Sequence, residues 1–198
     1  MTGTAKEYLT RIDILEIADT PSRGIEGVCF KLLKTHGDDR GFFREVFRDN
    51  DPLFRDGRFA QWSHSFMQQN VVKAWHYHHL QYDWWYLAVG QTETVLVDFR
   101  EESPTFRKKL VFKMGDSAQF GDDTLELCVR IPPGVLHGCR VLSSFAHLFY
   151  VTSRTYDPQD EGRYPYDSGE VDHQWGPGAI VVDNDRRRFV PAAPRIVP

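Results

Sequence analysis

Four residues of types that bind metals or move protons lie in two short segments of this chain. The segment WHYHHLQYDWWYLAVG contains His76, His78 and Asp83, and a Pro-Pro-Gly turn leads into His137. Side chains alternate between the two faces of a strand, so His76 and His78, two residues apart, share a face. A turn at residues 79–81 would return Asp83 to that face on the next strand. We therefore expect the four side chains to converge inside a small β-barrel.

These four residues permit two kinds of chemistry. Imidazole and carboxylate groups together form a suitable ligand set for Fe(II), Mn(II), Ni(II) or Zn(II). Imidazole also titrates near neutral pH, so the same residues suit proton transfer at a carbon atom. A pocket that binds an organic ligand without metal is the third interpretation, and the residue types alone leave all three open.

Short alternating or apolar runs, separated by turns rich in Gly, Pro and Asp, predict an all-β fold of the sandwich or barrel type. The runs are 27–33, 42–47, 59–66, 84–89, 92–99, 110–114, 125–132 and 146–152. Gly90 and Gln91 predict a hairpin between two of these runs, and residues 36–41 predict a turn. Residues 11–18 are the best candidate for a short helix. From Tyr156 onward we expect irregular chain that packs across the barrel mouth.

Length and composition predict a single domain over residues 1–198, with a core at about 25–155 and a C-terminal segment packed on it. The net charge of −4 disfavours a nucleic-acid partner. No run approaches the roughly 18 apolar residues of a membrane span, and the N-terminus lacks the apolar core of a secretory signal. Cys29, Cys128 and Cys139 lack CxxC spacing and are expected to be reduced thiols. These features predict a cytoplasmic protein without a membrane partner.

The spacing of the histidine segments resembles the two motifs of the cupin superfamily. In the first motif an H-x-H pair is followed by four residues, an acid, six residues and Gly, with Asp83 where the motif usually has Glu. The second motif, P-x-G-x-x-H, ends at His137. This resemblance implies a double-stranded β-helix, or jelly roll, with short peripheral helices. It also implies that His76, His78, Asp83 and His137 occupy the metal-ligand positions of that superfamily.

A second resemblance covers more of the chain, from about residue 27 to about residue 170. Five segments recur in order: 39–45 (DRGFFRE), 61–65 (QWSHS), 73–77 (KAWHY), 97–105 (VDFREESPT) and 132–138 (PPGVLHG). Together they resemble the nucleotide-linked 4-keto-6-deoxysugar 3,5-epimerases, such as the dTDP-4-dehydrorhamnose 3,5-epimerase family. The resemblance implies a metal-free cupin-type jelly roll that needs no cofactor, forms a homodimer and acts on a nucleotide sugar.

Epimerisation beside a ketone requires three groups: a base that removes the α proton, an acid on the other face, and a donor for the enolate oxygen. By resemblance, His76 matches the family's base. Tyr150, thirteen residues after His137, matches its tyrosine acid. The family's base is oriented by a distal aspartate, for which Asp185 is the best match and Asp183 the fallback.

The resemblance also implies which residues bind the substrate. Arg40 and Lys73 match positions that contact the diphosphate, where fixed cations meet phosphate charge. Glu45, Gln61 and His137 lie in the matching segments and are further expected binding positions.

One position departs from the family pattern. Asp83 stands where the epimerases have a lysine that supports the enolate oxygen, and an anion there would repel the developing charge. Loss of one such donor costs about 2.7–4 kcal/mol. Three functions therefore remain open: an epimerase in which Lys73, His78 or a metal acts as electrophile, a metal-dependent cupin enzyme, and a non-catalytic sugar-nucleotide binder.

Overall fold

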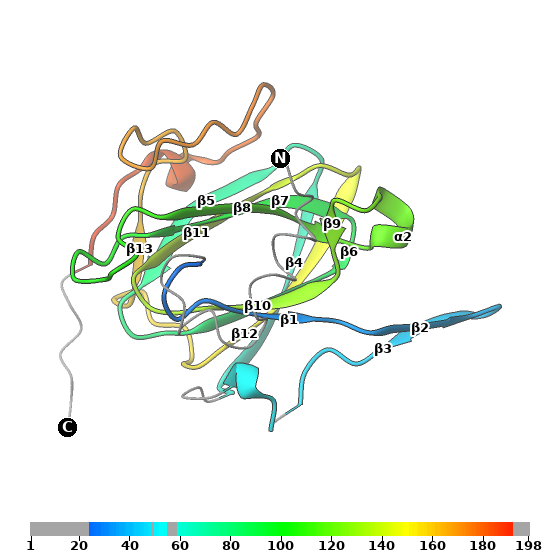
Figure 1. Cartoon of the computed structure of the whole chain (residues 1–198). Coiled ribbons are helices and arrows are strands. Elements are labelled where there is room, and N and C mark those ends of the chain that lie inside the picture. Colours follow the sequence, from blue (N-terminus) through cyan, green and yellow to red (C-terminus); the bar gives the residue numbers. More distant parts are fainter. Residues whose placement is uncertain (1–23, 49, 55–58, 192–198) are drawn as a thin grey trace.

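The computed structural model describes residues 24–48, 50–54 and 59–191, so the helix predicted at 11–18 lies outside the described residues. Two β-sheets face each other around a common interior (Figure 1). The first sheet has five strands in the order β1 (Cys29–Leu32), β10 (Leu127–Ile131), β6 (Asp83–Val89), β12 (Phe145–Thr152) and β4 (Gln61–Gln68). All of its neighbouring strands run antiparallel.

The second sheet has six strands. Their order is β13 (Glu161–Arg163), β5 (Val72–His78), β11 (Val135–Val141), β7 (Gln91–Asp98), β8 (Lys109–Gly115) and β9 (Thr124–Leu125). Only the short β8–β9 pair is parallel. Among the described residues, the helical elements are η2 (Pro52–Phe54), α2 (Ser117–Phe120) and η3 (Asp183–Arg186). Within the described residues no helix has the length and apolar character of a membrane span.

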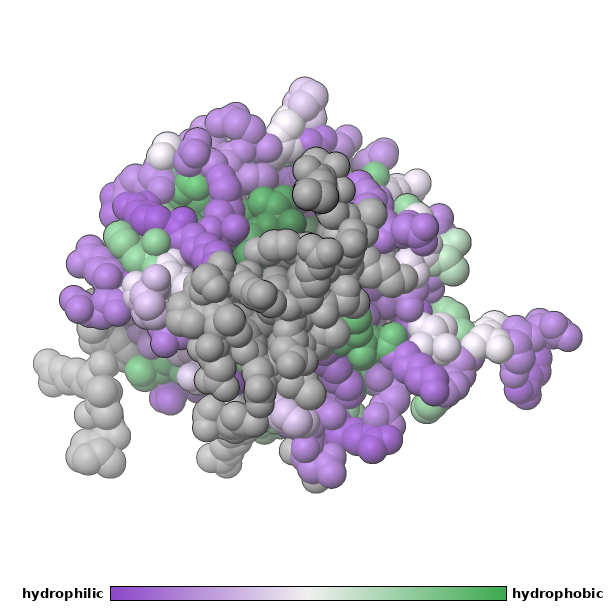
Figure 2. Space-filling model, in the orientation of Figure 1, coloured by the Kyte–Doolittle hydropathy of each residue, from purple (hydrophilic) through white to green (hydrophobic). Residues whose placement is uncertain are grey.

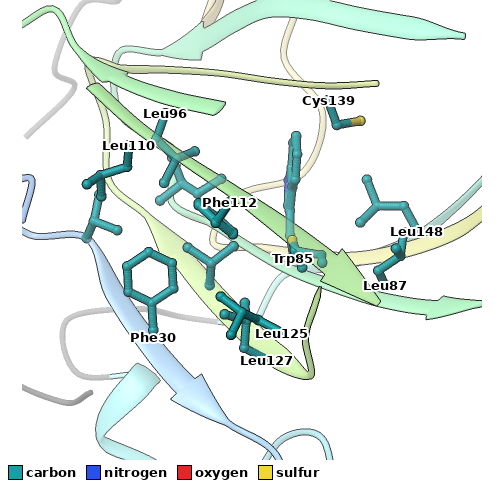
Figure 3. Packing of buried hydrophobic residues seen from close by; sticks show 14 of the residues in the cluster. Phe30, Trp85, Leu87, Leu96, Leu110, Phe112, Leu125, Leu127, Cys139 and Leu148 are labelled. Carbon is teal, nitrogen blue, oxygen red and sulfur yellow. The ribbon is translucent and has the colours of Figure 1, made fainter. Parts of the chain in front are cut away.

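The interior between the two sheets is filled by apolar side chains from both of them (Figure 3). Phe30 on β1 packs edge-on against Phe112 on β8, with ring centroids 5.2 Å apart. Trp85 on β6 belongs to the same cluster and lies near Leu87 and Leu148. Full burial of one such side chain contributes about 1.5–3 kcal/mol, so this layer holds the sheets together and forms one wall of the site described below.

Strict alternation along β6 gives its two adjacent tryptophans different roles. Trp85 points to the interior, whereas Trp84 points outward and is completely buried beneath η2. The indole nitrogen of Trp84 donates to the carbonyl oxygen of Leu53, at 2.7 Å. Because side chains alternate with period two, Asp83 shares the interior face of Trp85.

The predicted hairpin at Gly90 and Gln91 is wrong. β6 and β7 belong to different sheets, so the chain crosses from one sheet to the other at this point. Gly90 has φ +89, and a Cβ atom there would collide with the carbonyl oxygen of Phe145. A Gly-Gln pair between strands is therefore compatible with a crossover as well as with a tight turn, and the local sequence does not distinguish them.

A two-stranded arm formed by β2 (Thr35–Asp38) and β3 (Gly41–Arg44) projects away from the two sheets (Figure 1). The predicted turn over 36–41 is thus too long, because its first residues are strand. Arg44 fixes the base of the arm, since its buried side chain pairs with Asp116 and Glu126. The outer end of the arm is hydrophilic (Figure 2).

The C-terminal segment packs against the outer face of the six-stranded sheet. β13 adds an antiparallel strand to β5, and Ile180 forms a bridge with Val71. Trp175 is buried against Trp75, with ring centroids 4.9 Å apart. The segment therefore supports β5, the strand that carries His76 and His78.

Candidate active site

A cavity of about 250 Å³ lies between the two sheets. Its walls combine imidazole, carboxylate, amide and hydroxyl groups with a few apolar side chains. The lining residues are Gln61, Ser65, Lys73, His76, His78, Gln81, Asp83, Trp85, His137, Cys139, Leu148, Tyr150, Thr152, Tyr156, Glu161 and Arg163. A concave site with several convergent polar groups is typical of small-molecule binding.

His76 enters the cavity from β5, beside a carboxylate on β13. Its Nδ1 atom lies 3.4 Å from Oε1 of Glu161. The guanidinium of Arg163 binds the same oxygen, with Nε at 2.7 Å. Burial would raise the pKa of Glu161, but the hydrogen bond and charge of His76, together with Arg163, lower it to about 2. Glu161 is therefore ionised at neutral pH and orients the imidazole, which leaves Nε2 as the nitrogen that can exchange a proton.

Tyr150 lines the same cavity from β12, in the opposite sheet. Its strand register places it between Ser63 on β4 and Trp85 on β6. Burial is the main cause of its raised pKa, which the hydroxyl of Ser63 partly opposes. The phenol therefore keeps its proton at neutral pH, as a proton donor must.

Three further polar side chains form a tight group in the cavity. His78 Nε2 lies 3.9 Å from Asp83 Oδ1, and His137 Nε2 lies 3.8 Å from Asp83 Oδ2. One ligand atom from each residue lies within 4.8 Å of the other two. The amide nitrogen of Gln81 and the indole nitrogen of Trp85 also contact Asp83, at 2.8 and 3.3 Å. The structure thus brings together three of the four expected ligands, while His76 pairs with a different carboxylate.

His137 is buried at the centre of this group. Desolvation lowers its pKa to about 4, although the charge of Asp83 acts in the opposite direction. Its Nδ1 lies 3.0 Å from the carbonyl oxygen of Val135, which can only accept a hydrogen bond. His137 is therefore neutral near pH 7, with the proton on Nδ1 and a free lone pair on Nε2.

Two of the expected substrate-binding residues line the cavity in addition to His137. Gln61 donates to Ser63 and accepts from the backbone of Tyr156, at 3.0 Å in both cases. The Nζ atom of Lys73 donates to Ser65 Oγ at 2.8 Å. The side chains of β4 and β5 thus supply an amide and a cation at the cavity wall.

Other expected residues lie outside the cavity of their own chain. Arg40 lies at the exposed end of the arm and pairs with Asp38, and Glu45 pairs with Arg48. Asp185 is buried, but its carboxylate accepts the backbone N–H of Val182, at 3.0 Å, to begin η3. The carboxylate that lies beside His76 in this structure is that of Glu161. The fallback, Asp183, is exposed in the same short helix.

Sequence reasoning missed Glu161 and Arg163, both on β13. A strand of three residues inside a polar, turn-rich segment carries little periodic signal. The pattern Glu-Gly-Arg does alternate, which places both charged side chains on one face, but only the pairing of β13 with β5 brings that face to His76.

Comparison with known proteins identifies the family. A family model described as dTDP-4-dehydrorhamnose 3,5-epimerase matches residues 22–190. The chain belongs to the dTDP-4-dehydrorhamnose 3,5-epimerase family. It is 40% identical over 154 residues to the spore coat polysaccharide biosynthesis protein SpsL of Bacillus subtilis, covering 76% of this chain and 96% of that protein.

Two of the matching proteins are named as epimerases. The dTDP-4-dehydrorhamnose 3,5-epimerase of Salmonella typhimurium is 30% identical over 148 residues, covering 72% of this chain and 77% of that enzyme. A dTDP-6-deoxy-D-glucose-3,5-epimerase from Legionella pneumophila, solved in complex with dTDP-4-keto-L-rhamnose, superposes with a TM-score of 0.70 at 27% identity. That likeness covers 81% of this chain and 86% of the Legionella chain. The predicted fold and the predicted family are both confirmed.

Proposed function

We propose that this member of the epimerase family inverts one or more carbon centres of a dTDP-linked 4-keto-6-deoxysugar. The observation that carries the proposal is that His76 and Tyr150 line one cavity from opposite sheets. Epimerisation requires a base on one side of the reacting carbon and an acid on the other. The identity of the nucleotide is proposed from the Legionella relative, which was solved with dTDP-4-keto-L-rhamnose.

In the proposed reaction His76 Nε2 removes the proton from the carbon next to the keto group. The electron pair of that C–H bond moves to form an enolate, and Tyr150 returns a proton to the opposite face of the same carbon. The phenolate then regains a proton from solvent and His76 releases the one it took. No atom is gained or lost, so we propose that the reaction needs no redox cofactor.

Glu161 acts as a positioning residue in this scheme. Its ionised carboxylate holds the Nδ1 side of His76 and stabilises the imidazolium that forms when the base takes up a proton. Arg163 keeps Glu161 in place and brings positive charge to the cavity wall. With Lys73 it provides two cations that suit the diphosphate of a nucleotide sugar.

We also propose that the protein acts as a homodimer in which the arm of one subunit reaches the cavity of the other. Phe42 and Phe43 on the arm are 54% and 67% exposed, which is unusual for adjacent aromatic residues. Arg40, expected to contact the diphosphate, lies on this arm, outside its own cavity. A second copy would cover the exposed phenylalanines and complete the phosphate site.

A second exposed surface supports the same assembly. Aromatic side chains on the outer faces of β4 and β12 form a continuous row. Its members are Trp62, His64, Phe66, Phe145, His147 and Phe149. β4 is an edge strand of its sheet, and edge strands with an apolar face commonly pair with a second subunit.

The dimer proposal is tested by mixing two inactive variants. Arg40→Ala removes the arm cation and His76→Asn removes the base. If the arm completes the partner's site, a refolded equimolar mixture contains about one intact site in four, because half of the dimers are mixed and each of those has one. Activity near a quarter of wild type supports the arrangement. A mixture no more active than its parents, or a monomer in analytical ultracentrifugation, overturns it.

The epimerase proposal is tested by solvent exchange. A dTDP-4-keto-6-deoxyhexose incubated in D₂O with the protein should gain deuterium next to the keto group, measured by mass spectrometry and NMR. His76→Asn should slow this gain by about 10²–10⁴-fold. The matched control is His173→Gln, which removes a histidine that pairs with Glu93 outside the cavity. Binding of the nucleotide sugar without any exchange would make the protein a non-catalytic binder.

We also propose that the protein is cytoplasmic. Cys128 and Cys139 are buried free thiols, which fits the reducing environment of the cytoplasm.

A further inference from the structure

The two carboxylates that line the cavity differ in how their charge is balanced. Glu161 has Arg163 as a cation partner, whereas Asp83 has no lysine or arginine among its described ion pairs. Asp83 is 4% exposed, and its hydrogen-bond donors are the neutral amide of Gln81 and the neutral indole of Trp85. A buried carboxylate without a balancing charge is costly. The wall around Asp83 therefore favours a ligand that carries positive charge.

His137 faces Asp83 with a lone pair. The Nδ1 proton of His137 is donated to the carbonyl oxygen of Val135, so its Nε2, which lies 3.8 Å from Asp83 Oδ2, carries no proton. Two acceptors that face each other in a buried site repel unless a donor or a positive charge lies between them. An N–H group of a ligand at this point would donate to both.

His78 adds another accepting nitrogen on the other side of Asp83. The amide atom of Gln81 that lies 2.8 Å from Asp83 Oδ1 is its nitrogen, because an ionised carboxylate only accepts hydrogen bonds. The same amide nitrogen lies 3.2 Å from His78 Nε2, which therefore accepts the second amide proton. Both protons of the amide are then used. The acceptor wall formed by His78, Asp83 and His137 thus accepts more hydrogen bonds than it donates.

The spacing of the acceptor wall suits an ammonium group. When one ammonium donates to two acceptors at about 2.9 Å each, those acceptors lie about 4–5 Å apart. One nitrogen or oxygen atom from each of the three residues lies within 4.8 Å of the other two. A sugar hydroxyl offers one proton and no charge, whereas a protonated amine offers up to three protons and a full positive charge. The acceptor wall is therefore better matched to an amine than to a hydroxyl.

The acceptor wall and the cation Lys73 belong to opposite ends of β5. Lys73 and His78 are five residues apart, which is about 16 Å along a strand, and His76 lies between them. Lys73 suits the diphosphate of a nucleotide sugar, as argued above. A substrate that lies along β5 would therefore place its phosphates near Lys73, its reacting carbon at His76 and the far side of its sugar ring at the acceptor wall.

We propose that the substrate carries a protonated amino group on its sugar ring, which forms an ion pair with Asp83 and donates a hydrogen bond to His137. The substrate class is then a nucleotide-linked amino-keto-deoxysugar. This inference rests on the proposed function, since it names the substrate of the same cavity.

The amino group also accounts for the charge of residue 83. By resemblance, the epimerases have at this position a lysine that supports the enolate oxygen, and Asp83 reverses that charge. An ammonium on a carbon next to the keto carbon returns positive charge to the same region, where it stabilises the developing enolate. In a 4-keto-6-deoxyhexose the neighbours of the keto carbon are C3 and C5, and C5 already bears the ring oxygen and the methyl group. The amino group is therefore on C3.

Recognition is tested first by binding, with ligands that lack the keto group and so are not turned over. dTDP-6-deoxyglucose carries a hydroxyl at C3, and its 3-amino-3-deoxy analogue carries an amine there. Calorimetry at pH 7 should show that wild type binds the amino ligand about 10–100-fold more tightly. Asp83→Asn, which keeps the shape of the side chain, should bind the two ligands about equally. N-acetylation removes the charge of the amine, so wild type should bind the 3-acetamido ligand no better than the hydroxyl ligand, and this measurement needs no variant.

The matched control is Glu161→Gln, the same acid-to-amide change at the other carboxylate of the cavity, which should keep the preference for the amino ligand. Equal binding of the amino and hydroxyl ligands by wild type overturns the amino substrate and leaves the epimerase proposal in place. The same holds for acetamido binding as tight as amino binding, or for a preference that survives in Asp83→Asn. Binding of none of the ligands overturns both proposals.

The role of the ammonium in the reaction is tested by solvent exchange. The 3-amino and 3-hydroxy forms of the 4-keto sugar are incubated in D₂O with the protein, and each rate is divided by its rate without protein. A larger acceleration for the amino form supports the role, and an equal or smaller one overturns it. Preferential binding of the amino ligand without exchange of either keto sugar would support the recognition while contradicting the proposed function.

Discussion

Two buried aspartates, Asp98 at the end of β7 and Asp83 at the start of β6, have very different surroundings. Asp98 accepts two hydrogen bonds from the guanidinium of Arg100, both 2.8 Å, and others from the hydroxyls of Ser103 and Thr105, at 2.5 and 2.6 Å. Burial raises the pKa of Asp98, but these donors outweigh it and lower the pKa. They fix the loop after β7, and the charge has a complete set of partners.

Asp83 is almost equally buried, at 4% against 0%, yet it has no cation among its described ion pairs. Two neutral side chains donate to it, and two imidazoles face it at a distance longer than a hydrogen bond. A complete set of partners identifies a structural carboxylate. An incomplete set beside a cavity is what we expect of a carboxylate that meets a ligand.

Isosteric replacement should separate the two aspartates most clearly. Asp98→Asn removes the charge that balances Arg100, and breaking such a pair costs about 3 kcal/mol of the free energy of unfolding. Asp83→Asn removes a charge that has no lysine or arginine among its described ion pairs, so the change should be within about 1 kcal/mol. Urea unfolding followed by tryptophan fluorescence measures both. Equal losses in the two variants would contradict the distinction.

The surroundings of Glu161 are intermediate between those of Asp98 and Asp83, because Glu161 has a cation partner and also faces the cavity. Its pKa is lowered from 4.5 to about 2, so its contribution to stability is present above pH 4.5 and is lost as the pH falls toward 2. The full contribution is about 3 kcal/mol at most. The difference in free energy of unfolding between wild type and Glu161→Gln should therefore shrink over this range. Glu45→Gln, which changes an exposed residue paired with Arg48, should show a smaller difference, and an equal one would refute the assignment.

The same substitution should affect turnover more than substrate binding. Glu161→Gln leaves an amide beside His76 Nδ1 and removes the charge that stabilises the imidazolium. We expect kcat to fall by about 10–100-fold, or about 1.4–2.7 kcal/mol, with KM nearly unchanged. Asp185→Asn should have a smaller effect on kcat, since its carboxylate begins η3. The reverse order would restore Asp185 as the orienting residue.

The sequence was sufficient to predict the direction of a side chain wherever the two-residue period of a strand determines it. The shared face of His76 and His78, and the inward direction of Gln61 and of Asp83, all follow from alternation along strands. The positions of most strands also followed from apolar runs, because each strand has at least one buried face.

The remaining features depend on contacts between distant segments. The partner of His76 is set by the pairing of β13 with β5, and nothing in the local sequence around Glu161 specifies that pairing. Likewise, whether Gly90 makes a hairpin or a crossover depends on which strands lie beside β6 and β7. The tertiary fold determines which strands are neighbours, and those neighbours set both the partner of His76 and the connection at Gly90.

The smallest expected change in stability comes from altering the geometry of the hydrogen bonds that Arg100 donates to Asp98. Arg100→Lys keeps the positive charge but replaces the two-pronged guanidinium contact with a single ammonium, and it also removes the hydrogen bond to the carbonyl oxygen of Glu26. We expect a loss of about 1 kcal/mol in the free energy of unfolding. The matched change at the cavity is Lys73→Arg. Among the described residues, the Lys73 ammonium donates a hydrogen bond only to Ser65, so we expect no measurable change in the free energy of unfolding. If Arg100→Lys were as harmless as Lys73→Arg, charge alone would account for the structural role of Asp98. The contrast with Asp83 would then depend on the presence of a cation and not on the geometry of its donors.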